Sequence, residues 1–301
     1  MTVTARQQSL SQHMSVLMVA SPVPSHPSTM LIWEAIASLG RSGLDSDIPI
    51  ILAHDAPRPR ADASTINRYH DYLEELQREV AGNSRFKVVV SEQWGHLSGA
   101  IRTGLSHVRT PLVLICQHDF VFAREINWRG LVYAFESDPQ IKHLRFNKRN
   151  NLPTHWDGTP PERSRHFRER LISTPSGNIR ITKTIAWSDN NHLTSTAYYS
   201  EVVGGLLGNR KTFPESPLNL IATSKTHPIL GTYLYGGRGE PPSITHLDGS
   251  GDPAPCSPQA NRSTSARSFA NFARVRLQTV HDKVFLRLRL HIWLYRQRRH
   301  S

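Results

Sequence analysis

The sequence has few cysteines, no long apolar run and fewer acidic than basic residues. Its two cysteines are Cys116, inside an apolar run, and Cys256, in a segment rich in Pro and Ser, so a disulfide framework is not expected. No uncharged apolar run is long enough to span a bilayer, and residues 1–14 lack the apolar core of a secretory signal. These absences make a reducing, cytoplasmic location the expected one.

The shortage of acid is greatest near the C-terminus. The chain has 36 Lys and Arg against 24 Asp and Glu, a net charge of +12, which attracts anionic membranes, polyanions and phosphorylated substrates. Asp282 is the only acid beyond residue 265, where nine basic residues lie: Arg267, Arg274, Arg276, Lys283, Arg287, Arg289, Arg296, Arg298 and Arg299. Such a tail predicts contact with an anionic membrane, with a plain solvated tail as the alternative. It disfavours a nucleic-acid-binding protein, whose basic residues usually share a face with aromatic ones.

Short apolar runs alternate with helical patterns along the first part of the chain. Strands are predicted at residues 16–20, 48–53, 86–90 and 111–116, and helices from Ser28 to Gly40, over residues 63–80 and within residues 95–105. This alternation predicts an α/β fold with a mostly parallel sheet flanked by helices. Such sheets bind ligands at the carboxyl ends of their strands.

The chain is expected to form one main domain with two tails. We predict a disordered N-terminal tail over residues 1–14, a domain over residues 15–250, a linker over residues 251–268 and a basic C-terminal segment over residues 269–301. In that segment, leucines alternate with basic residues, which favours a strand. A basic apolar helix lying on a membrane surface is the alternative.

Polar residues follow three of the predicted strands. Ser21 and Pro22 come after the first, Asp55 after the second, and Gln117-His118-Asp119 after the fourth. An acid just beyond a buried strand can hold a divalent cation against a diphosphate, because oxygen ligands suit magnesium and manganese. Asp119 is placed for this role, and a turn or helix-capping aspartate is the alternative.

The order of these elements, together with the segment from Gly95 to Leu105, resembles the nucleotide-binding half of GT-A glycosyltransferases, particularly family-2-like enzymes. The resemblance covers roughly the first 120 residues well and the rest of the chain only by scattered landmarks. It implies a GT-A-like, Rossmann-like fold and transfer of a sugar from a nucleotide-diphosphate sugar to an acceptor hydroxyl, metal-assisted and inverting. The implied acceptor is a saccharide or a lipid-linked group, and the implied metal is Mn²⁺ or Mg²⁺.

Donor-binding residues follow from the resemblance. Ser21, Pro22 and Asp55 correspond to the groups that hold the nucleoside, with ordinary turn chemistry as the alternative. Gly95 and Arg102 lie in the segment matching the family's Gly-rich element, although the family's Ala-Arg-Asn triplet is replaced here by Ala100-Ile101-Arg102. That segment could equally be a helix packed closely on the sheet.

The metal-binding motif of the family departs from its usual form here. Gln117 stands where the first acid of the Asp-X-Asp motif is usual, which leaves Asp119 as its only carboxylate, with Gln117 and His118 as donor contacts. A later histidine often completes the metal site, and His246, in a short strand-like run, is in the corresponding place. Chance placement is the alternative, because the chain has 16 histidines.

An inverting transfer needs a base for the acceptor hydroxyl. Glu215 and Asp189 are the candidates. The resemblance favours Glu215, because it precedes a predicted helix in the region where family members carry their acidic base; either could instead be a cap or a surface acid. A nucleotidyltransferase is the nearest rival function. It would normally have a glycine-rich phosphate loop after the first strand, where residues 21–27 are rich in proline.

Overall fold

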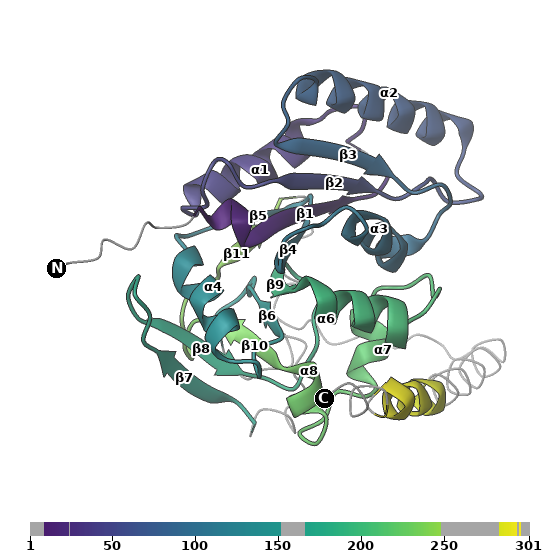
Figure 1. Cartoon of the computed structure of the whole chain (residues 1–301). Helices are drawn as coiled ribbons and strands as arrows, with labels where there is room; N and C mark the ends of the chain where they lie inside the picture. Colours follow the sequence, from purple (N-terminus) through teal and green to yellow (C-terminus); the bar gives the residue numbers. More distant parts are fainter. Residues whose placement is uncertain (1–8, 24, 152–165, 248–282, 294, 296–301) are drawn as a thin grey trace, which may run out of the picture.

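The computed structural model describes residues 9–23, 25–151, 166–247, 283–293 and 295. These residues form a central sheet of nine strands with helices on both faces (Figure 1). The strands are β1 (Met14–Ala20), β2 (Ile50–His54), β3 (Phe86–Val90), β4 (Leu112–Gln117), β6 (His143–Arg145), β7 (Arg168–Ile172), β8 (Ile179–Lys183), β9 (His192–Ser195) and β10 (Thr232–Tyr235). Their order across the sheet is β3-β2-β1-β4-β9-β6-β10-β8-β7.

The sheet is mixed but mostly parallel. β1 pairs in parallel with β2 on one side and with β4 on the other, and β3 extends the parallel half beyond β2. Among the described strands of this sheet, β8 and β9 alone run against the others. The four strands predicted from the sequence are present within two residues of the expected bounds, and the α/β class is confirmed.

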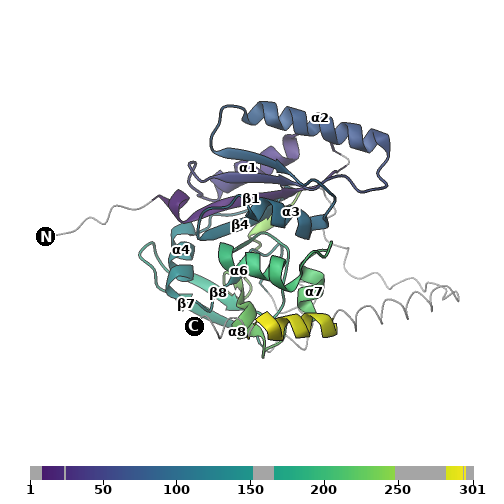
Figure 2. The same ribbon diagram turned by 45° about the vertical axis from the view of Figure 1, so that its right-hand side comes forward.

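The helices fall into two layers because successive side chains of a buried strand point to opposite faces. Val16 and Met18 of β1 belong to one buried cluster, and Leu17 and Val19 belong to the other. The first layer contains α1 (Met30–Arg41), α2 (Ala63–Val80) and α4 (Trp128–Ser137). The second contains α3 (His96–Leu105), α6 (Thr196–Ser200) and the π-helix η3 (Glu201–Leu206), and α3 lies in front of the sheet in Figure 2.

A small second sheet extends from the end of β4. It joins β5 (Phe120–Phe122) to β11 (Ile244–His246) in antiparallel pairing, with Phe120 opposite His246. The remaining short elements are η1 (Leu10–Gln12), α7 (Glu215–Asn219) and α8 (His227–Leu230). The small sheet brings a late segment of the chain beside the end of β4.

Near both termini the structure differs from what the sequence favoured, and at the C-terminus it has the helix that was left open as the alternative. Residues 283–293 form a helix, not a strand, because Leu286 and Leu290, four residues apart, are both buried against the second cluster. Near the N-terminus, disorder was expected as far as residue 14, but η1 forms and Leu10 is buried. The proposed linker 251–268 and the other parts of the tails lie outside the described residues.

Candidate active site

A pocket of about 720 Å³ opens at the carboxyl ends of β1, β2 and β4. It lies where parallel sheets bind ligands. Six of the residues predicted for donor or metal binding line it: Ser21, Pro22, Asp55, Gln117, His118 and Asp119. Three loops far apart in the sequence are therefore brought together at one sheet edge, as the alternation of strands and helices predicts.

Asp55 connects the loop after β2 to the beginning of α3. Its Oδ1 accepts hydrogen bonds from the backbone N–H groups of Ala56, at 3.1 Å, and Gly95, at 2.8 Å. Burial raises the pKa of this carboxyl, while the N–H groups of Gly95 and His96 act in the opposite direction. A side chain at Gly95 would not fit, because a Cβ there would lie 2.7 Å from the Cα of Gly99. Asp55 thus fixes one wall of the pocket.

Arg102 lies apart from the other predicted donor-binding residues. Its Nη1 donates to the backbone carbonyl of Gly208 at 2.8 Å, and it is not among the pocket residues. Gly104, two residues on, allows α3 to pack on the sheet, since a Cβ there would clash with Leu17. This half of α3 therefore has the close helix packing that the sequence left open as its alternative role.

Asp119 and His246 meet at the end of β4. The Nε2 of His246 lies 3.1 Å from the Oδ2 of Asp119, and both side chains are mostly buried. The Oδ1 of Asp119 is buried and has no hydrogen-bond partner among the described residues. The pairing of β11 with β5 holds the histidine in place, and the N–H of Leu247 donates to the carbonyl of Asp119 at 2.8 Å. Two residues separated by 127 positions thus form one polar pair.

Gln117 makes two hydrogen bonds to the segment that contains Asp189 and Asn191. Its Nε2 donates to the backbone carbonyl of Asp189 at 2.8 Å, and its N–H donates to the Oδ1 of Asn191 at 3.0 Å. A carboxylate in its place could not donate to a carbonyl. The amide at this position therefore has a structural reason.

The two candidate bases are in direct contact with each other. Both carboxylate oxygens of Asp189 accept from the N–H of Glu215, at 3.0 and 3.1 Å, and the N–H of Asp189 donates to Oε2 of Glu215 at 3.1 Å. Burial raises the pKa of Asp189 well above its usual value, and the nearby charge of Glu215 adds to this effect. Asp189 caps the start of α7, and Glu215 is half-buried beside it.

His118, which lines the pocket, is mostly buried, with its Nδ1 3.2 Å from the carbonyl of Val19. Two more buried histidines lie near it. Burial lowers the pKa of His26 to about 4 and that of His54 to about 3, and His118 contributes to both shifts. His26 stacks on Tyr72, with ring centroids 4.0 Å apart. At neutral pH, His26 and His54 are therefore uncharged.

Several pocket residues were not predicted from the sequence: Arg58, Arg60, Trp94, His96 and Phe213. The two arginines follow Asp55 in the same loop, so their position after a strand could have identified them. His96 has a φ of +60°, which is rare for a residue with a side chain and is often found at functional sites. Its ring lies 4.4 Å from that of Phe213, a residue that belongs to a distant segment. No spacing of residues in the sequence would predict this contact between His96 and Phe213.

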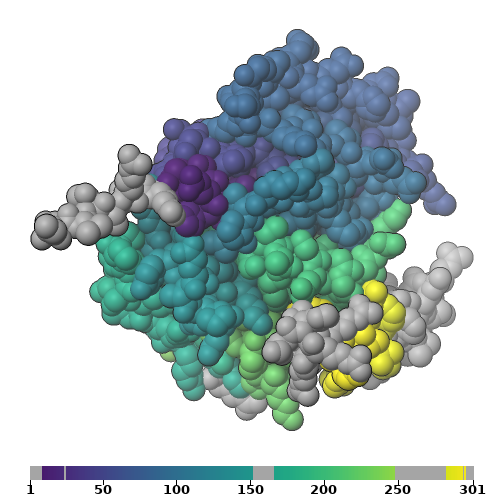
Figure 3. Space-filling view, viewed as in Figure 1, coloured from purple at the N-terminus to yellow at the C-terminus, as the bar shows by residue number. Residues whose placement is uncertain are grey.

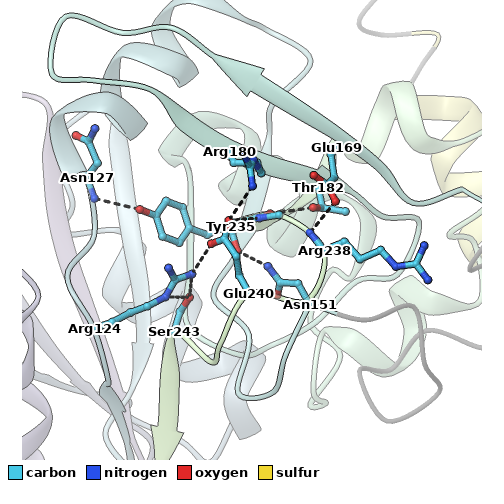
Figure 4. A network of polar contacts seen from close by, with 12 residues as sticks. Arg124, Asn127, Asn151, Glu169, Arg180, Thr182, Tyr235, Arg238, Glu240 and Ser243 are labelled. Atoms are coloured by element: carbon cyan, nitrogen blue, oxygen red, sulfur yellow. Dashed lines mark hydrogen bonds and ion pairs between the residues drawn. The ribbon is translucent and has the colours of Figure 1, made fainter.

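A polar network holds the connection between β10 and β11, the segment that leads to His246 (Figure 4). Glu240 accepts from the N–H of Gly237 at 2.8 Å and from Nη2 of Arg124 at 3.3 Å. The same Nη2 also donates to Oγ of Ser243 at 3.1 Å. The carbonyl of Tyr235, at the end of β10, accepts from the side chain of Asn151 at 2.7 Å. The network thus fixes this segment just before β11.

Comparisons with known proteins give weak structural likenesses. No family model matches the chain, and no curated protein matches it in sequence. The structure titled S. aureus TarS is 11% identical, with a TM-score of 0.44 over 75% of this chain and 36% of that one. The structure titled GalNAc-T7 with UDP, GalNAc and Mn²⁺ is 13% identical, with a TM-score of 0.48 over 87% of this chain and 48% of that one. S. aureus TarS 1–349 in complex with UDP-GlcNAc is 12% identical, with a TM-score of 0.45 over 92% of this chain and 71% of that one.

This chain therefore spans about a third to a half of the first and second of these proteins. Within the ranges that the structure describes, no helix combines the length and the apolar character of a membrane span.

Proposed function

We propose that this protein is a GT-A-type glycosyltransferase that moves a sugar from a nucleotide-diphosphate sugar to an acceptor hydroxyl. The observation that carries the proposal is the contact between Asp119 and His246, 3.1 Å apart. Asp119 lines a pocket together with Ser21, Pro22 and Asp55. These residues come from four separate segments of the chain. Their convergence at the carboxyl ends of β1, β2 and β4 is the arrangement that the sequence resemblance implies.

Asp119 and His246 would hold the metal ion. A carboxylate oxygen without a hydrogen-bond partner, with an imidazole nitrogen close by, is a suitable pair of ligands for Mn²⁺. Among the described residues there is no group of three or more His, Cys, Asp or Glu that could hold a metal by itself. Phosphate oxygens of the donor would then supply further ligands, and the bound metal would stabilise the negative charge of the departing diphosphate.

The pocket would take the nucleotide portion of the donor. Ser21, Pro22 and Asp55 line it on the side of β1 and β2, where the nucleoside would lie. Arg58 and Arg60 line the same pocket and add positive charge toward a diphosphate. In this account Arg102 is a helix-packing residue, because its guanidinium is bonded to the carbonyl of Gly208.

Glu215 would act as the base for the acceptor hydroxyl, and Asp189 would position it. The carboxylate of Asp189 accepts from the N–H of Glu215, so Asp189 fixes the start of α7 from which the Glu215 side chain extends. Asp189 is 7% exposed, whereas Glu215 is half-buried and more accessible to an acceptor. The acceptor would be a saccharide or a lipid-linked group.

The experiment is a hydrolysis and binding screen with a panel of nucleotide sugars, with and without Mn²⁺. The parent is compared with Asp119→Ala and with Asp71→Ala, a control that removes an exposed acid from α2. The proposal predicts Mn²⁺-dependent hydrolysis of at least one donor that Asp119→Ala abolishes and Asp71→Ala retains. If no nucleotide sugar binds, and Asp119→Ala changes only stability, the proposal fails.

A further inference from the structure

The helix formed by residues 283–293 has apolar side chains on two opposite faces. Leu286 and Leu290 lie on the inner face and are buried in the core. Val284, Leu288 and Ile292 lie on the outer face and are 62%, 59% and 46% exposed. Their spacing of four residues places them along one stripe of an α-helix. A folded domain gains nothing from such a stripe in water, because exposed apolar area is unfavourable.

Basic residues border the outer stripe. Lys283, Arg287 and His291 are exposed and are also four residues apart. Each of them comes one position before a member of the stripe. The sequence between residues 283 and 293 contains no acid, and Asp282 is the only one beyond residue 265. An apolar stripe with a cationic border has the chemistry of the interface between the headgroups and acyl chains of an anionic membrane.

The helix is fixed to the domain. The indole Nε1 of Trp293 donates to Oε2 of Glu201 in η3 at 2.8 Å. The guanidinium of Arg210 lies 4.8 Å from the ring centroid of Phe285. Figure 3 shows the helix, in yellow, at the surface next to the green segments of the domain. The outer stripe is therefore held in a fixed direction relative to the pocket.

We propose that the outer face of this helix is a membrane-binding surface that lies in the headgroup region of an anionic bilayer. Val284, Leu288 and Ile292 enter the acyl boundary, and Lys283 and Arg287 contact the lipid phosphates. The surface would bring the domain to a membrane by contact with one leaflet and would need no membrane-spanning helix. The inference does not depend on the proposed enzymatic activity, since it rests only on the exposure, spacing and charge of this helix.

The test is co-sedimentation of the full chain with vesicles of phosphatidylcholine alone or mixed with phosphatidylglycerol. The double variant Leu288→Glu/Ile292→Glu changes only exposed positions, and Leu171→Glu is the matched control, because Leu171 is 62% exposed on β7 at the far edge of the sheet. We expect the parent and the control to sediment with the anionic vesicles and not with the neutral ones. The double variant should bind anionic vesicles on the order of tenfold more weakly, since two apolar side chains no longer enter the bilayer.

Two results would overturn the proposal: equal sedimentation of the double variant and the parent with anionic vesicles, or no sedimentation of the parent. In the second case, a parent that is dimeric by light scattering and a double variant that is monomeric would assign the stripe to contact between two copies. Circular dichroism and thermal unfolding of each variant establish that the fold is retained, and donor binding measured in the same samples reports on the proposed activity separately.

Discussion

The side-chain amide of Gln117 donates a hydrogen bond to the backbone carbonyl of Asp189 at 2.8 Å. This contact joins the end of β4, which leads to Asp119, to the segment that contains Asp189, one of the two candidate bases. It also gives a structural reason for the amide at this position, where the resemblance leads one to expect the first acid of a metal-binding motif. Only a donor can satisfy that carbonyl, and a carboxylate cannot donate.

The first prediction concerns restoration of the missing acid. Gln117→Glu should place a carboxylate against the carbonyl of Asp189 and destabilise the fold by about 1–3 kcal/mol, because a hydrogen bond is lost and an acceptor faces an acceptor. Donor hydrolysis should decrease rather than improve. Urea unfolding and hydrolysis rates measure the two effects, with Gln117→Ala as the comparison that removes the bond without adding a charge. A Gln117→Glu enzyme with higher Mn²⁺-dependent activity would show that this contact is unimportant.

The second prediction separates the roles of the two carboxyls. Glu215→Gln should lower kcat by roughly 10²–10⁴-fold with little change in the KM for the donor, because it removes the base and keeps the shape. Asp189→Asn should act more weakly, because it keeps the base and replaces one of the two oxygens that accept from the N–H of Glu215. Steady-state rates across pH measure both, and Glu74→Gln, an exposed acid on α2, is the control. Equal losses in Asp189→Asn and Glu74→Gln would contradict the positioning role.

The third prediction concerns the network behind His246. Glu240→Ala removes the bonds to Gly237 and Arg124 and should lower the free energy of unfolding by about 1–2 kcal/mol. It should also raise the Mn²⁺ concentration needed for half-maximal activity, because His246 follows this segment. Glu34→Ala, which breaks a surface ion pair on α1, should leave the metal requirement unchanged. A metal requirement that stays constant in Glu240→Ala would indicate that the network stabilises the fold only.

The fourth prediction is a loss of stability in mild acid. Burial lowers the pKa of His26, His54 and His192 to about 4, 3 and 4, and that of His143 well below 6.5. Below pH 6.5 the unfolded chain therefore binds protons that the folded chain does not bind, so the stability that is complete above pH 6.5 decreases as pH falls toward 4. The raised pKa values of Asp55 and Asp189 act in the opposite sense, but the lowered histidines outnumber them.

Urea unfolding between pH 7.5 and pH 5 measures this dependence. Each buried histidine contributes up to about 1.4 kcal/mol per pH unit within the window. His26→Gln should make the dependence shallower without changing its sign. A free energy of unfolding that is constant or rises between pH 6.5 and pH 5 would contradict the assignment of neutral buried histidines.

The sheet and the pocket could be predicted from the sequence because strand runs and polar strand ends are local features. Asp55 and Asp119 each follow a buried run directly, so their meeting at one sheet edge needs no knowledge of distant contacts. The partners of Gln117 and the pairing of Asp189 with Glu215 could not be predicted, since they join segments separated by tens of residues through irregular structure. For His246, the sequence suggested the residue by resemblance, and the pairing of β11 with β5 supplies the geometry.

The C-terminal helix shows why periodicity misled. Leucine at every second position from residue 286 to 290 matches a strand, yet in the helix Leu286 and Leu290 face the core while Leu288 faces outward. A strand with alternating leucines and a helix with two apolar faces can have the same order of apolar and polar residues in the sequence. Only the packing against the domain distinguishes them.

The central claim is that Asp119 and His246 hold a metal ion together with the donor diphosphate. Electron paramagnetic resonance of Mn²⁺, titrated with the protein in the presence and absence of nucleoside diphosphates, tests it most directly. We predict that the protein alone binds Mn²⁺ weakly, that a nucleoside diphosphate strengthens binding beyond the affinity of the free nucleotide, and that Asp119→Ala and His246→Ala each abolish the gain. Enhanced binding that survives in both variants, or no enhancement in the parent, would contradict the account.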